Sequence, residues 1–187
     1  DPSIASTYGN MGNIYQQMGN HDQALESYTK AMAIYKDKFS EDHLFVASCW
    51  NNMGIIYQAK RMPQHALNCY RTALDIRKEH CDPVHLHVAT SHHNLAAVCA
   101  SIGDHATALE HLHRALPIYQ THSATHPRML PTLVVIADLC ERQMDFVEAL
   151  AYYRQAQAIH LVTNTSLDLE AMKVNQSIAR VSCKLQQ

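Results

Sequence analysis

Apolar positions recur at helical spacing along most of the chain, and this pattern itself repeats about every 42 residues. Residues 8–15 align with 50–57, then with 92–99 and, after a shift of 41, with 133–140. A fixed period of this length is typical of repeat proteins built from one supersecondary unit. The pattern predicts a single domain over residues 1–187, with helix pairs over approximately 4–38, 44–80, 86–121 and 129–162 and a terminal helix over approximately 167–187.

The second half of each unit repeats in register with the first. Two alanine positions recur in all four units: Ala24, Ala66, Ala108 and Ala149, then Ala31, Ala73, Ala115 and Ala156. The second unit also reads W-x2-L-G-x2-Y through Trp50, Met53, Gly54 and Tyr57. In these positions the chain resembles the tetratricopeptide repeat family. The resemblance implies an all-α fold, a right-handed superhelical solenoid of four helix-turn-helix repeats and a C-terminal capping helix.

The period is longer than the usual 34 residues of this family. The extra residues lie between the units, at 39–47, 80–89 and 122–132. In this period and in its asparagine-rich first helices, the chain resembles the tetratricopeptide domain of kinesin light chains over roughly residues 1–160. That resemblance implies a concave groove lined by asparagines that receives short cargo peptides, and hence an adaptor role. The fourth unit departs from the pattern, with Val135 where the family usually has asparagine.

The first helix of each unit has two distinct faces at 100° per residue. Trp50, Gly54 and Tyr57 share the face that we expect to pack on the second helix of the same unit. The opposite stripe faces the expected groove and is largely polar. We predict that the peptide-binding residues are Asn10, Asn13, Gln17, Ser48, Asn51, Asn52, Ile55, Thr90, His93, Asn94, Arg142 and Arg180, with Asn51 at the rim.

Asn10, Asn52 and Asn94 place one amide in each of the first three units. An amide both donates and accepts hydrogen bonds, so it can pair with the backbone of an extended peptide of any sequence. The structural alternative is that these amides tie neighbouring first helices together, and both roles can hold at once.

The stripe becomes basic toward its C-terminal end, through Arg142, Lys173, Arg180 and Lys184. These charges favour a ligand with acidic residues. The alternative is a solvated face on a capping helix, which is polar in any solenoid.

Composition excludes several classes of protein. The formal net charge is −2, which argues against a nucleic-acid partner, and no apolar run approaches the roughly 20 residues of a membrane span. The six cysteines form no CxxC pair and mostly occupy apolar helix positions, so we expect reduced thiols and a cytoplasmic protein. The chain begins at Asp1 rather than Met, and we expect a piece of a longer protein.

Catalytic and metal sites are not predicted. The sequence has no glycine-rich phosphate loop and no G-x-S-x-G, and its cysteines fall at positions that the repeat buries, so we expect no enzyme activity and no cofactor. Among the 14 histidines, His122 and His126 have the i, i+4 spacing of zinc ligands but flank a Thr-His-Pro turn, so we expect most histidines on the surface and no metal.

The alternative function is a structural scaffold or a self-associating repeat domain. No polar capping helix precedes the first unit in this sequence, so Ile4, Met11 and Ile14 are expected to present apolar surface to a preceding repeat or to a partner. One local irregularity is also expected: Pro117 should kink the second helix of the third unit or end it early.

Overall fold

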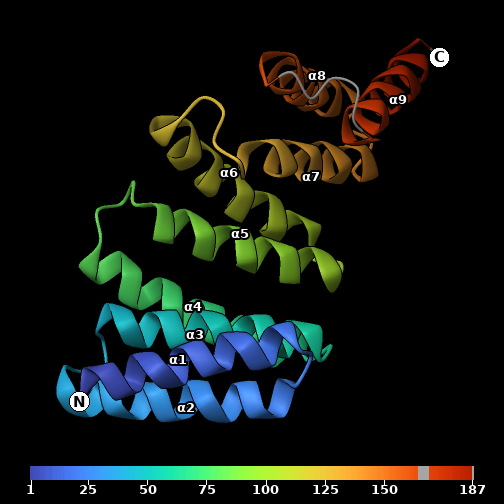
Figure 1. Cartoon of the computed structure of the whole chain (residues 1–187). Coiled ribbons are helices and arrows are strands. Elements are labelled where there is room, and N and C mark those ends of the chain that lie inside the picture. Colours follow the sequence, from blue (N-terminus) through green and yellow to red (C-terminus); the bar gives the residue numbers. More distant parts are fainter. Residues whose placement is uncertain (164–168, 187) are drawn as a thin grey trace. The chain divides into compact units, whose positions relative to one another are not determined.

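The computed structural model describes residues 1–163 and 169–186, and every regular element in these ranges is an α-helix (Figure 1). The chain divides into two compact units, Asp1–Asp104 and His105–Gln187, which are described separately. The predicted terminal helix includes residues 167, 168 and 187, which lie outside the described residues. That the whole chain forms one domain stays a prediction.

The first unit contains two antiparallel helix pairs and a fifth helix. Its elements are α1 (Pro2–Gln17), α2 (His21–Lys38), α3 (Leu44–Ala59), α4 (Pro63–His80) and α5 (Leu86–Ser101). We call the first helix of each pair an A helix and the second a B helix. The A helix α3 packs on the preceding B helix α2 as well as on its own partner α4, and α5 packs on α4. This is the stacking that a helical repeat requires to bury a continuous core.

The second unit consists of α6 (His105–His122), α7 (Met129–Arg142), α8 (Phe146–Val162) and α9 (Leu169–Leu185). The B helix α6 contacts the A helix α7, α7 pairs with α8, and α9 packs on α8 as a further A-type helix. The helix bounds agree with the predicted repeats to within two residues wherever both are described. Pro117 does not end α6, which continues through it to His122.

A tyrosine of the B helix lies over a glycine of the A helix in each of the first two pairs. A Cβ atom added to Gly12 would lie 2.6 Å from Cε1 of Tyr28, and one added to Gly54 would lie 2.6 Å from Cε1 of Tyr70. Both tyrosine side chains are fully buried. Because each glycine has no side chain, the tyrosine ring fits between the two helices of the pair.

The turn between the helices of each pair requires a left-handed residue. Gly19, Arg61, Gly103 and Met144 occupy equivalent positions of the four repeats, with φ between 57° and 84°. The first and third repeats have glycine at this position. The second and fourth have Arg61 and Met144, although a left-handed backbone is unfavourable for residues with a side chain.

Two histidines in equivalent linker positions, His43 and His85, cap the starts of A helices, and a third, His126, makes the same kind of bond in the turn before α7. Nδ1 of His43 accepts a hydrogen bond from the backbone N–H of Phe45, and Nδ1 of His85 and of His126 does the same two residues downstream. Such bonds satisfy N–H groups that the first turn of a helix leaves unpaired. Part of the histidine content is thus structural.

Candidate ligand-binding surface

On α1 the predicted binding residues Asn10, Asn13 and Gln17 are all exposed. Asn13 also has a structural partner, because the hydroxyl of Tyr28 donates to its Oδ1 at 2.7 Å and to Oε1 of Gln16 at 3.0 Å. Burial raises the pKa of Tyr28 to about 12, so this hydroxyl stays a donor at neutral pH. Asn13 therefore secures the first helix pair as well as facing solvent.

Asn51 lies inside the repeat stack rather than at its rim. Only 9% of its surface is exposed, and its Oδ1 accepts from Nδ2 of Asn94 at 3.0 Å and from Nη1 of Arg77 at 3.4 Å. Its own Nδ2 donates to Oδ1 of Asn52 at 3.4 Å. Asn51 thus connects α3 to the next A helix, α5, and orients the two neighbouring amides.

Asn52 and Asn94 are half-buried, and each makes one of these bonds. A primary amide has two donor hydrogens and two acceptor lone pairs, so one bond leaves most of its capacity for a ligand. The tie between A helices that was expected as an alternative does form, and it runs through Asn51 and Asn94.

The remaining predicted residues of the first unit lie on the same side of α3 and α5. Ser48 is exposed, while Ile55, Thr90 and His93 are half-buried. The hydroxyls of Ser48 and Thr90 donate to backbone carbonyls one turn earlier, at 3.0 and 2.9 Å. They can therefore only accept hydrogen bonds from a ligand while these contacts persist.

Arg77 is a buried cation that the sequence prediction did not include. It is 4% exposed, and its Nη1 donates to Oγ of Ser91 at 2.6 Å and to the carbonyl of His87 at 3.2 Å. Burial lowers the pKa of Arg77, yet a guanidinium keeps its charge in a protein. A signal was present, because the equivalent positions of the flanking repeats carry Tyr35 and Tyr119.

A cavity of about 410 Å³ opens in the second unit between α7, α8 and α9. Its wall combines apolar side chains with a few polar ones. The lining residues are Leu130, Pro131, Val134, Val135, Asp138, Tyr153, His160, Glu170, Lys173, Val174, Gln176, Ser177 and Arg180. Convergent apolar and polar groups of this kind are typical of ligand sites.

The repeat register explains where this cavity lies. The layer that Asn51, Arg77 and Ser91 fill in the first unit corresponds to Val134, His160 and Val174 in the second. In the first unit a long guanidinium and its hydrogen-bond partners occupy this layer. In the second unit the same three positions line open space.

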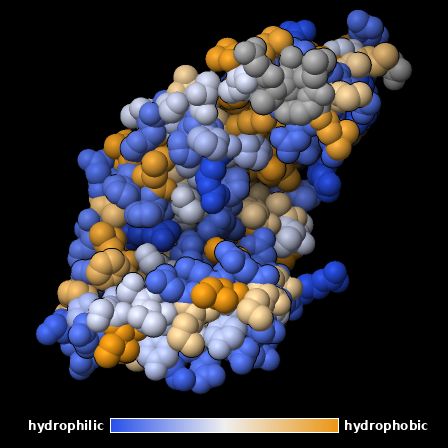
Figure 2. Space-filling view, viewed as in Figure 1, coloured by the Kyte–Doolittle hydropathy of each residue, from blue (hydrophilic) through white to orange (hydrophobic). Residues whose placement is uncertain are grey.

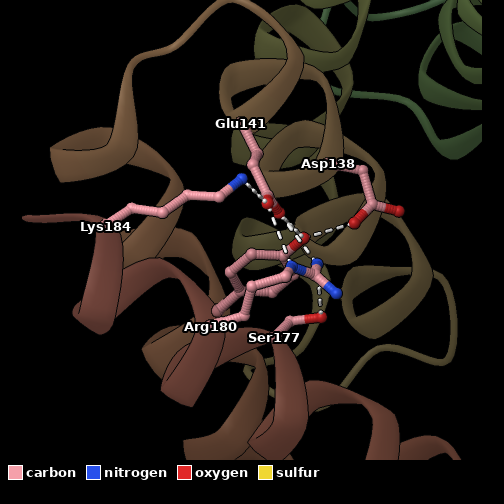
Figure 3. A network of polar contacts seen from close by, with 6 residues as sticks. Asp138, Glu141, Ser177, Arg180 and Lys184 are labelled. Atoms are coloured by element: carbon pink, nitrogen blue, oxygen red, sulfur yellow. Dashed lines mark hydrogen bonds and ion pairs between the residues drawn. The ribbon is translucent and has the colours of Figure 1, made fainter.

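Two of the four residues at the basic end of the stripe, Arg180 and Lys184, are paired within the protein (Figure 3). Glu141 on α7 accepts from Nε and Nη2 of Arg180 at 3.0 and 2.9 Å and from Nζ of Lys184 at 3.0 Å. The Arg180 guanidinium, followed by Lys184, holds the pKa of Glu141 at about 2. Arg142 is exposed at the end of α7. The carboxylate of Glu141 therefore compensates much of the Arg180 charge before any ligand binds.

The hydroxyl of Tyr153 lies against the same network, since it donates to Asp138 and, at 3.3 Å, to Glu141. These two acceptors occupy the positions that Asn13 and Gln16 hold beneath Tyr28. Each tyrosine thus fixes two polar residues on the A helix of its own pair.

Within residues 1–163 and 169–186, we assign no second site to the thiols or to possible metal ligands. Among the described residues, Asp42, Glu79 and His80 are the one group that could hold a metal ion, with ligand atoms within 4.8 Å of one another. Nε2 of His80 lies 3.2 Å from a carboxylate oxygen of Asp42, so an internal pair already accounts for two of the three, and we assign no metal. All six cysteines are free, and burial raises the pKa of Cys49, Cys69 and Cys140 to about 11.

The chain belongs to the tetratricopeptide repeat family, whose model matches residues 3–79 and 87–161. The predicted family and the all-α tetratricopeptide fold class are therefore confirmed. Repeats of this family form protein–protein interaction surfaces and scaffolds. In the part of the chain that the structure describes, no helix is long and apolar enough to cross a membrane.

Several solved structures share the fold. One is a Podosopora anserina protein described as a kinesin light chain with nearly identical TPR-like repeats, with a TM-score of 0.81 and 22% identity over 97% of this chain and 86% of that one. BtubC (BKLC) from P. vanneervenii has a TM-score of 0.80 and 25% sequence identity, over 88% of this chain and 66% of that one. The apo form of RapI has a TM-score of 0.80 and 16% sequence identity, over 98% of this chain and 70% of that one. A search of curated proteins found no match.

Proposed function

We propose that the A-helix faces of this chain bind an extended peptide segment of a partner protein, in a cytoplasmic adaptor role like that suggested by the kinesin light chain resemblance. The observation that carries the proposal is the cavity on α7, α8 and α9. Its lining includes Val135 on α7, the fourth-unit equivalent of Asn94, and the predicted binding residue Arg180 on α9. We propose no catalytic role for the chain.

The cavity is suited to an apolar side chain of the ligand. Val134, Val135 and Val174 supply apolar wall, and a volume of about 410 Å³ exceeds that of any single amino-acid side chain. Burial of such a side chain contributes roughly 1.5–3 kcal/mol, which makes it an effective anchor for an otherwise extended segment.

The amides of the first unit are suited to a peptide backbone. Asn52 and Asn94 keep unused donors and acceptors, and Asn51 holds both in place. We propose that Asn10, Asn52 and Asn94 contact ligand backbone, whereas Asn51 acts by positioning the other two. Asn13, Gln17, Ser48, Ile55, Thr90 and His93 would add local contacts.

A preference for acidic ligands rests on Arg142 and Lys173 of the predicted basic end and on Arg77, which the sequence prediction did not include. Glu141 compensates Arg180 and Lys184. Arg77 behind the amides has only neutral oxygens among its hydrogen-bond partners given above, and Arg142 and Lys173 are exposed. Uncompensated positive charge attracts anionic ligands and makes binding sensitive to salt.

The test begins with a displayed library of random peptides about 12 residues long, selected on the wild-type chain. Selected peptides are then titrated by fluorescence polarisation against Val134→Phe, which fills the cavity, and against Asn52→Ala. Matched controls are Val147→Phe on α8, where the side chain is 69% exposed, and Asn68→Ala on an exposed site of α4.

We expect Val134→Phe and Asn52→Ala each to weaken binding by about tenfold or more, and the two controls to leave it unchanged. Arg77→Gln should reduce the dependence of affinity on salt, because the amide keeps donors but removes the charge. Failure to select any peptide, or equal affinity for all variants, would sink the proposal.

A further inference from the structure

The buried side chain of Arg77 fixes the orientation of the Asn51 amide. A guanidinium carries donors only, so every atom that hydrogen-bonds to it must be an acceptor. Nη1 of Arg77 donates to Oδ1 of Asn51 at 3.4 Å and to Oγ of Ser91 at 2.6 Å. The Asn51 amide cannot turn round, because its NH2 group would then face a buried cation that has only donors.

The orientation of Asn51 passes to the amides on either side. Oδ1 of Asn51 also accepts from Nδ2 of Asn94 at 3.0 Å, and Nδ2 of Asn51 donates to Oδ1 of Asn52 at 3.4 Å. An amide carries its oxygen and its nitrogen on opposite sides of the amide carbon. Asn94 therefore turns its nitrogen toward Asn51 and its oxygen away, and Asn52 does the reverse.

The two half-buried amides thus offer different groups to a ligand. Asn94 keeps both lone pairs of its oxygen and one donor hydrogen, whereas Asn52 keeps both donor hydrogens and one lone pair. Figure 2 shows hydrophilic residues gathered over α5 in the middle of the view, so a ligand that lies there meets polar groups. Asn94 is mainly an acceptor for such a ligand, and Asn52 is mainly a donor.

The other repeats lack the residues that fix this direction. The side chains equivalent to Asn51 and to Arg77 are Gly9, His93 and Val134, and Tyr35, Tyr119 and His160. None of these pairs joins an amide to a guanidinium. Asn10 follows a glycine, so no equivalent amide orients it. A fixed direction is therefore expected at Asn52 and Asn94 and not at Asn10.

We propose that Arg77 is a positioning residue that gives the groove a fixed hydrogen-bonding direction, in which Asn52 donates to a backbone carbonyl of the ligand and Asn94 accepts from a backbone N–H. This inference rests on the proposed function and specifies which backbone atoms each amide selects. An extended peptide presents both groups along one edge, so it can satisfy the two amides at once. A proline opposite Asn94 has no N–H to donate and is disfavoured there.

The test changes the backbone of a peptide selected on the wild-type chain, one position at a time. N-methylation removes one N–H, whereas replacement of an amide by an ester also weakens the carbonyl acceptor. Each peptide is titrated against wild type, Asn52→Ala and Asn94→Ala, and a modification is coupled to a side chain when its effect disappears in that variant. We expect one N-methylation to be coupled to Asn94 by about fivefold and none to Asn52. One ester replacement should be coupled to Asn52.

A variant of Asn51 tests the network from within. Asn51→Asp has an oxygen on both sides and still accepts from Arg77 and Asn94. It faces Asn52, however, with an acceptor in place of a donor. Asn52 should then turn its NH2 group toward residue 51 and its oxygen toward the ligand. An N-methylation of the peptide should therefore become coupled to Asn52, in addition to the one coupled to Asn94.

Two variants test Arg77 itself. Arg77→Met keeps a long side chain without donors, and Arg77→Lys keeps donors only. Asn51 is free to turn in Arg77→Met, so the coupling of N-methylation to Asn94 should disappear there and persist in Arg77→Lys. Loss of a merely structural contact would weaken all peptides equally and leave the coupling in place.

The possible outcomes separate this inference from the proposed function. Coupling of N-methylation to Asn52 instead of Asn94 in the wild type, or to neither, overturns the fixed direction and leaves peptide binding established. Coupling to Asn94 that persists in Arg77→Met overturns the role of Arg77. If Arg77→Met does not fold, an unchanged pattern in Asn51→Asp overturns the network. Failure to select any peptide overturns both the proposed function and this inference.

Discussion

At the residue scale, the packing of a tyrosine explains the glycine in the middle of each of the first two A helices, Gly12 and Gly54. Gly54 lies beneath the ring of Tyr70, whose hydroxyl donates to Gln58 at 3.2 Å. A glycine in the middle of a helix costs roughly 0.5–1 kcal/mol of stability relative to alanine. The packing of a fully buried aromatic ring outweighs that cost.

We predict that Gly54→Ala lowers the free energy of unfolding by about 1–3 kcal/mol, because the new methyl group overlaps the Tyr70 ring. Gly9→Ala is the matched control, since a Cβ there meets nothing within 4 Å. It should stabilise the chain by about 0.5–1 kcal/mol through helix propensity. Urea denaturation monitored by circular dichroism measures both.

A second variant checks the cause of the Gly54→Ala effect. The third repeat has Ala96 and Leu112 at the two equivalent positions. Adding Tyr70→Leu to Gly54→Ala should therefore cost less than the sum of the two single changes. Full additivity would mean that the methyl group and the ring do not compete for space. The fourth repeat combines Ala137 with Tyr153, so the constraint depends on the spacing of each pair.

At the element scale, the turns between paired helices differ in how well their residues suit the backbone. Met144 has φ of 66° and its side chain is 70% exposed, so it gains little packing for a strained conformation. We predict that Met144→Gly raises the free energy of unfolding by about 0.5–1 kcal/mol. Gly103→Ala, at φ of 84°, should lower it by a similar amount. A loss of stability in Met144→Gly would contradict this account.

The contact between α7 and α9 should depend on pH. The Glu141 side chain is 13% exposed and accepts from Arg180 and Lys184, which hold its pKa at about 2, below its ordinary value of 4.5. A depressed pKa in the folded state contributes stability above the unfolded pKa and loses it as pH falls through the folded pKa. The contribution is therefore complete above about pH 5 and fades toward pH 2.

We predict that Glu141→Gln lowers the free energy of unfolding by about 1–2 kcal/mol at pH 7, a modest value because both cations are partly exposed. The difference from wild type should shrink steadily when unfolding is repeated at pH 5, 4 and 3. Glu26→Gln is the control, since its exposed pair with Lys30 should change stability little at any pH. A pH-independent difference would assign the effect to packing.

At the scale of the whole molecule, the repeat pattern was sufficient to predict the helices and the polar face of the A helices. Helical period and repeat register determine which side of a helix a residue lies on, and Asn10, Asn52 and Asn94 are exposed or half-buried, as a solvent-facing stripe requires. That they contact a ligand stays a prediction. Helical period does not determine how deeply a residue is buried. Asn51 was expected at the rim and is buried, because its position depends on Arg77 in another helix.

Contacts between distant helices account for the other features that the sequence did not reveal. Glu141 neutralises Arg180 across 39 residues, and the cavity exists because His160 and its neighbours leave open the layer that Arg77 fills. The histidine caps were missed for a different reason, since histidine is not among the preferred N-cap residues. Comparing equivalent positions between repeats, rather than motifs within one repeat, would have pointed to Arg77 and His160.

The tyrosines and their hydroxyl acceptors also limit how such a chain can recombine. Where Tyr28, Tyr70 and Tyr153 occur, the A helix of the same repeat carries an acceptor such as Gln16, Gln58 or Glu141. The third repeat has Leu112, and Ala97 and Ala100 replace the acceptors. A genetic crossover between repeats keeps each tyrosine hydroxyl with its acceptor. A crossover within a repeat can bury a tyrosine hydroxyl that has no acceptor, which lowers the stability by about 1–3 kcal/mol. The heritable module of this architecture is thus the whole helix pair, and gene rearrangements that respect its borders should yield folded hybrids far more often than those that divide it.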